Sequence, residues 1–165
     1  MALLGSAQVW NSGALRVQNK ASNSAEEVSK QFIAQLTGYG VAEKRYHTDT
    51  YFFIGKQRLI SNKSVSDPYA EFLFESLSLQ IYLPQFRARL STSNGNSARV
   101  RVEPDKAAPP REVVLIREKG AWKVDLMATY ANWNQLTEAQ ARQQVIRRGA
   151  LSLPQGPLSP PPKND

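Results

Sequence analysis

The chain has 165 residues, of which 41% are hydrophobic and 21% charged, and its 21 Lys and Arg against 14 Asp and Glu give a formal charge of +7. It contains no Cys and one His. This excludes disulfides, thiolate chemistry and metal sites built from several His. No apolar run approaches the roughly 20 residues that span a bilayer. The length suits one globular domain, and the composition leaves its compartment open.

Residues 1–23 are rich in small and amide side chains, and we expect them to form an N-terminal arm. Trp10 in such a segment is expected to dock on the domain or on a partner. The apolar start, residues 1–7, has no basic residues before it. We therefore favour an ordinary terminus over the end of a longer export or anchor segment. Membrane tethering is expected only if an upstream anchor exists.

An amphipathic helix is predicted directly after the arm. Ser24 and Glu27 form a capping box, in which the hydroxyl bonds a first-turn amide and the carboxylate reaches back. The helix is expected to end at Gly38 and Gly40. Its buried face is predicted from helical spacing to consist of Val28, Phe32, Ile33 and Leu36.

A second helix is predicted to begin at Asp67 and Pro68, because Asp is favoured at the N-cap and Pro in the first turn. Its buried stripe is expected to contain Tyr69, Phe72, Leu73 and Leu77. From Leu77 onward apolar residues alternate with polar ones, which predicts a strand that runs up to Pro84.

A hairpin is predicted on either side of a Ser-Asn-Gly-Asn turn sequence. A two-residue turn would mix charged and apolar side chains on both faces, so we expect an odd turn, residues 94–96. This turn sets Arg89 opposite Arg101 and Leu90 opposite Val100. The apolar face is then Ala88, Leu90, Val100 and Val102. The other face carries Arg87, Arg89, Arg99 and Arg101.

A second hairpin is predicted over residues 112–127, with a two-residue turn at Lys119 and Gly120. The expected cross-strand pairs are Arg117 with Trp122, Leu115 with Val124, and Val113 with Leu126. Residues 113–116 are apolar on both faces, so this strand is expected to lie at the centre of the sheet.

Asp125 would face Val114 across this second hairpin. A carboxylate beside apolar groups has a raised pKa and suits acid–base chemistry. Lys123 is its neighbour on the same face, so the alternative is a surface ion pair. We favour the ion pair.

A last helix is predicted over residues 138–148, after a capping box formed by Thr137 and Gln140. It is expected to end at Gly149. The tail from residue 151 repeats proline with the three-residue period of polyproline II at Pro154, Pro157 and Pro160. Such a tail lies extended on a partner or remains disordered.

The segment from Leu115 to Asp125 reads Leu-x-x-x-x-Gly-x-Trp-Lys-Val-Asp. It resembles the final hairpin of nuclear transport factor 2-like domains, and the order of a long helix, short helices and an antiparallel meander is also similar. The resemblance covers about residues 24–130. It implies a cone in which a curved sheet wraps helices and often leaves a pocket. The superfamily contains isomerases and dehydratases as well as transport factors and non-catalytic modules, so the fold alone does not choose a function.

The expected fold class is α+β, with N-terminal amphipathic helices packed on a curved antiparallel sheet, a C-terminal helix and an extended Pro-rich tail. The expected divisions are an arm, the α+β domain, a helix and a tail, at residues 1–23, 24–130, 131–150 and 151–165.

One acid–base candidate lies between the two predicted helices. His47, Asp49 and Tyr51 would share a face if this segment is a strand. A His–carboxylate pair there could act as general base and orienting group, as the resemblance to dehydratases suggests. The alternative, which we favour, is a solvated polar loop, because no second catalytic signature accompanies these residues.

The favoured function is that of a non-catalytic accessory or scaffolding subunit, which binds protein partners or further copies of itself. Its partner-binding residues would be Trp10, Arg87, Arg89, Arg99, Arg101, Pro154, Pro157 and Pro160. For the four arginines the alternative is a solvated outer sheet face, on which they also prevent aggregation through the edge. Nucleic acid is disfavoured because no aromatic residues alternate with the arginines. The alternative is a protein with a pocket for a small apolar ligand, or an isomerase- or dehydratase-like enzyme using His47 and Asp49. No cofactor or metal is expected, because phosphate-loop and metal-cluster motifs are missing from the sequence.

Overall fold

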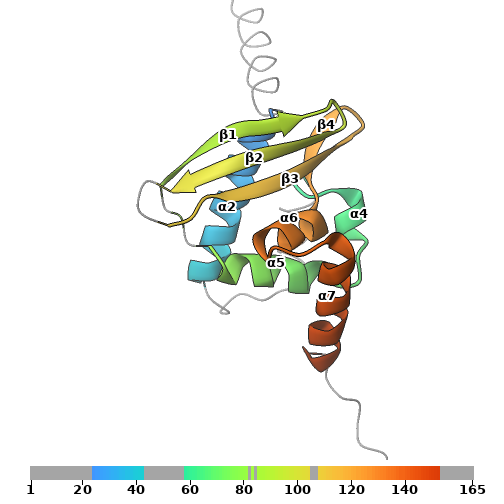
Figure 1. Cartoon of the computed structure of the whole chain (residues 1–165). Helices are drawn as coiled ribbons and strands as arrows, with labels where there is room; N and C mark the ends of the chain where they lie inside the picture. Colours follow the sequence, from blue (N-terminus) through green and yellow to red (C-terminus); the bar gives the residue numbers. More distant parts are fainter. Residues whose placement is uncertain (1–23, 43–57, 82, 84, 105–107, 153–165) are drawn as a thin grey trace, which may run out of the picture.

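The computed structural model describes residues 24–42, 58–81, 83, 85–104 and 108–152 (Figure 1). In these ranges one antiparallel sheet lies over a layer of helices, which agrees with the expected α+β class. The four strands follow the order of the chain: β1 (Phe86–Ser93), β2 (Ser97–Pro104), β3 (Arg111–Glu118) and β4 (Ala121–Val124). The helices are α2 (Ala25–Ala42), α4 (Asn62–Val65), α5 (Ala70–Leu79), α6 (Leu126–Trp133) and α7 (Glu138–Ser152).

Helix α2 begins where the capping box predicts, and the Glu27 amide donates to the Ser24 hydroxyl over 3.1 Å. The predicted buried face is confirmed, since Val28, Phe32, Ile33 and Leu36 are each at most 4% exposed. The predicted stop is wrong, because α2 continues through both glycines to Ala42. Gly38 does not take the left-handed conformation that ends a helix there.

Helix α5 begins at Ala70, slightly later than predicted, and Asp67 accepts a hydrogen bond from the Tyr69 amide over 2.9 Å. The predicted strand from Leu77 is wrong, because α5 continues to Leu79. Leu77 is buried by its helical spacing from Leu73, whereas Leu79 is 79% exposed. Apolar and polar residues can alternate over a few positions in a helix as well as in a strand, so this pattern did not distinguish a helix from a strand here.

The first hairpin has the predicted central pairs, with Arg89 opposite Arg101 and Leu90 opposite Val100. The predicted odd turn is wrong: the Asn94 amide donates to the Ser97 carbonyl over 3.0 Å, which leaves a two-residue turn of Asn96 and Gly95, whose φ is 91°. The odd residue that sets the register, however, lies in the strand rather than in the turn. The pairing shifts between Leu90 and Thr92, which indicates a β-bulge at Ser91.

The second hairpin turns at Lys119 and Gly120. Their φ values of 50° and 80° are typical of the two-residue type I′ turn that commonly joins hairpin strands. The predicted pairs Arg117 with Trp122 and Leu115 with Val124 are confirmed. The predicted strand beyond Val124 is wrong, because helix α6 starts at Leu126.

Helix α7 has both bonds of the predicted capping box: the Thr137 amide donates to Gln140 Oε1 over 3.0 Å, and the Gln140 amide donates to Thr137 Oγ1 over 3.2 Å. Contrary to prediction, the helix continues through Gly149. A methyl group at Gly149 would lie 2.6 Å from the Tyr69 ring. This glycine therefore permits close packing between α7 and the start of α5.

The core lies between the sheet and the helices. Its sheet side contains Val100, Val102, Val113 and Leu115, all 0% exposed. Helix α7 joins the same core through Ala141 and Val145. Among the helices in the described ranges, none combines the length and the apolar character required to cross a bilayer.

Candidate functional site

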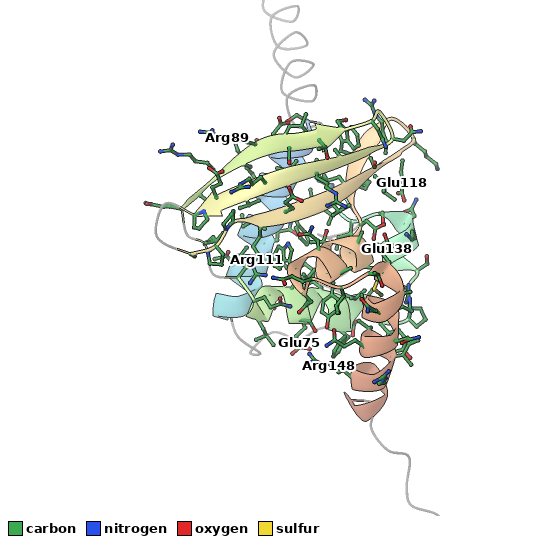
Figure 2. All side chains as sticks on the ribbon, viewed as in Figure 1. Glu75, Arg89, Arg111, Glu118, Glu138 and Arg148 are labelled. Atoms are coloured by element: carbon green, nitrogen blue, oxygen red, sulfur yellow. The ribbon has the colours of Figure 1, made fainter. Side chains whose placement is uncertain are left out.

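The face of the sheet opposite the helices carries four arginines. In β1 and β2 they alternate with side chains of the core face, so the register places them together on the outer side. We call this set the Arg face: Arg87, Arg89, Arg99 and Arg101. Figure 2 shows Arg89 on β1, on the side of the sheet away from the helices.

Two carboxylates lie on the same outer face and neutralise part of its charge. Arg99 Nη1 lies 3.4 Å from Glu112 Oε2, and Arg101 Nε lies 3.0 Å from Glu103 Oε1. The side chains of these two arginines remain 53% and 51% exposed, so each ion pair contributes little to stability. The face keeps an excess of positive charge, because four arginines share it with these two glutamates.

Arg89 is the least compensated of these cations. It lies directly opposite Arg101, and like charges in this arrangement repel. Arg101 binds Glu103 on its own strand, while no carboxylate in the described ranges pairs with Arg89. The β1 side of the Arg face is therefore where an external anion would be held most favourably.

The other predicted site residues lie outside the described residues. This applies to the acid–base candidates His47, Asp49 and Tyr51. It applies equally to the expected anchors in the arm and tail, which are Trp10, Pro154, Pro157 and Pro160. Their roles stay predictions.

Asp125 lies across from Val114 as predicted, since its amide donates to the Val114 carbonyl over 2.9 Å, but its carboxylate does not pair with Lys123. It caps helix α6, because its Oδ1 accepts the Ala128 amide over 3.1 Å. Its Oδ2 lies 3.1 Å from Lys63 Nζ, so the ion-pair partner is Lys63 rather than Lys123. The residue is 3% exposed. The hydrogen bond and the negative charge of Asp125 raise the pKa of Lys63.

A second ion pair joins helix α7 to the start of α5. Arg142 Nη2 lies 2.6 Å from Asp67 Oδ2. Burial alone would raise the pKa of Asp67, but hydrogen bonds from Arg142 and the Tyr69 amide, together with nearby positive charge, lower it. Sequence reasoning named Lys123 for Asp125 and no partner for Asp67, because the observed partners, Lys63 and Arg142, are distant along the chain. For Asp125, its place before an apolar helical segment was an N-cap signal.

We expect the Asp67–Arg142 pair to make stability depend on acid pH. Because the folded pKa of Asp67 lies below 3.8, its contribution is complete above that value and is lost as pH falls through the folded pKa. Urea unfolding at pH 7 should show Arg142→Gln to be less stable than the wild type, and the difference should shrink below pH 4. The same change at exposed Arg147 is the control. A difference that is constant with pH would contradict the assignment.

No group of three or more His, Asp or Glu side chains in the described ranges is arranged to hold a metal ion. Comparisons of the chain with protein-family models, with curated proteins and with solved structures found no match. The described residues themselves define the class: an α+β domain in which a four-stranded antiparallel meander is covered by helices on one face.

Proposed function

We propose that the protein is a non-catalytic accessory or scaffolding subunit that binds protein partners of a larger assembly. The observation that carries this proposal is the one-sided sheet. Its inner face is filled by helices, while the Arg face is exposed and has an excess of positive charge. The sheet register places the Cα atoms of these arginines on one face, which suits an acidic protein surface.

The proposal extends to the fold family and to the two ends of the chain. The order of helices followed by an antiparallel meander supports a nuclear transport factor 2-like domain. The tight turn at Gly120, followed by Trp122, also supports it. Trp10 in the arm and the prolines of the tail would add contacts to partners outside the Arg face.

Charge reversal at Arg89 tests the proposed function. Arg89→Glu should leave the fold intact, because it places a carboxylate opposite Arg101 and removes a like-charge pair. The full chain and its variants would be affinity-purified from the native source. We expect Arg89→Glu to reduce recovery of the co-purifying partner by about tenfold or more, as the loss of a charge-assisted contact predicts.

The matched control is Arg147→Glu on helix α7, which changes the net charge equally at another exposed position. It should retain the partner. A strictly monomeric wild-type protein with no co-purifying partner would contradict the proposal. Equal loss in both variants would also contradict it, since total charge rather than the Arg face would then control binding.

A further inference from the structure

Strand β1 is the edge of the sheet that is left uncovered in the described part of the chain. The opposite edge is covered at Val124, whose amide donates to the Leu59 carbonyl over 2.7 Å and whose carbonyl accepts from the Ser61 amide over 2.9 Å. Within the same ranges β1 pairs with β2 alone. An eight-residue edge strand of this kind presents backbone donors and acceptors to an additional strand.

The two faces of β1 have opposite chemical character. Arg87 and Arg89 point to the outer side of the sheet, whereas Ala88 and Leu90 belong to the core side. Leu90 is nevertheless 46% exposed, although its cross-strand neighbour Val100 is 0% exposed. The difference arises because β1 is the outermost strand. In the described part of the chain, a large apolar side chain, Leu90, therefore lies next to a basic side chain without a carboxylate partner, Arg89, along this edge.

We propose that this edge receives an extended segment of a partner protein in which acidic and apolar residues alternate, added to the sheet as a further strand beside β1. Backbone hydrogen bonds hold such a strand, and its side chains select it. On the outer side its carboxylates lie next to Arg87 and Arg89. On the core side its apolar side chains cover Leu90, because neighbouring strands keep their faces in common. This inference rests on the proposed function and specifies how the partner binds.

The charges on β1 argue against a second copy of this chain as the occupant. In a symmetric antiparallel pair of β1 strands centred on Ala88, Arg87 of one copy would face Arg89 of the other copy. Like charges across a strand pair are destabilising, and charged edge residues are a common means of preventing such self-association. The carboxylates of an acidic strand would attract these arginines, whereas a second β1 would place further arginines beside them.

Binding of a synthetic peptide to the full chain tests the inference. The probe is a peptide of about eight residues that alternates Glu and Val, a length that matches an ordinary strand. Its control has the same composition with all Glu residues in one block. Calorimetry should show binding of the alternating peptide only. Hydrogen exchange should show that amides of β1 exchange readily in the unbound chain and are protected when this peptide binds.

Two pairs of variants separate the basic and the apolar contributions. Arg89→Glu should weaken binding by about tenfold and favour an alternating Lys–Val peptide, while Arg147→Glu should have no effect. Leu90→Ala should weaken binding by about tenfold, because it removes buried apolar area. Leu79→Ala, at the exposed leucine of α5, should not.

Several results would overturn the inference. These are equal binding of the blocked peptide, slow exchange of the β1 edge in the unbound chain, and concentration-dependent dimerisation that Leu90→Ala abolishes. If the native partner is lost with Arg89→Glu but kept with Leu90→Ala, and the peptide does not bind, then strand addition is wrong and the proposed function stands. If no partner is recovered in any form, the proposed function itself fails.

Discussion

Replacing Phe32 with Ala should lower the free energy of unfolding by about 4 kcal/mol, because it deletes a large buried side chain and leaves a cavity. Phe32 and Phe74 are both 0% exposed. Their ring centroids lie 6.1 Å apart with an interplanar angle of 81°, an edge-to-face pair that joins α2 to α5. Urea unfolding followed by circular dichroism would measure the loss.

Phe32→Leu is the matched control and should cost about 1 kcal/mol, since most of the buried apolar volume is retained. Leu79→Ala removes a side chain of similar chemistry from an exposed position and should change stability by less than about 0.5 kcal/mol. A loss below about 1 kcal/mol for Phe32→Ala would contradict the packing of α2 against α5 beneath the sheet.

Replacing Asp125 with Ala should cost about 2 kcal/mol in the free energy of unfolding. The variant loses the N-cap of α6, a change that costs up to about 2 kcal/mol. We expect the upper end of this range because the Ala128 amide, which loses its acceptor, is partly buried. The ion pair adds little, because the side chain of Lys63 is 59% exposed. Thermal and urea unfolding at neutral pH would measure the effect.

Two further variants separate the cap from the charge. Asp125→Asn keeps a capping oxygen and should cost less than half as much as Asp125→Ala. Lys63→Met removes only the ion pair and should cost less than about 0.5 kcal/mol. If Lys63→Met were as destabilising as Asp125→Ala, then the charge rather than the helix cap would hold Asp125 in place.

The features that could be predicted from sequence were those controlled by neighbouring residues. The capping boxes at Ser24 and Thr137 appear as expected, because the groups that bond each other are three residues apart. The pairing of Arg89 with Arg101 also followed from local alternation. Only one register gave an apolar face, so the position of the Arg face could be derived before the structure was known.

The features that could not be predicted depend on segments that are distant in sequence. Glycine often ends a helix, so Gly149 was predicted to end α7. In the structure α7 continues, and the Tyr69 ring packs closely against the backbone at Gly149. In the sequence, Asp125 continues the pattern of the preceding strand. In the structure it caps α6, and its Oδ2 lies 3.1 Å from Lys63 Nζ. In each case the partner belongs to an element more than 60 positions earlier in the chain, which no local pattern reveals.

By itself, the sequence determined where helix α2 buries its apolar stripe and which strand residues share the Arg face, because spacing along one or two adjacent segments decides both. The tertiary structure decided that residues beyond Leu77 remain helical and that Val124 ends a strand. It also decided that, among the described residues, β1 has β2 as its one neighbouring strand, while residues 59–61 pair with Val124 at the edge of β4. Edge exposure is a property of the assembled sheet, since it depends on which element lies next to a strand in space.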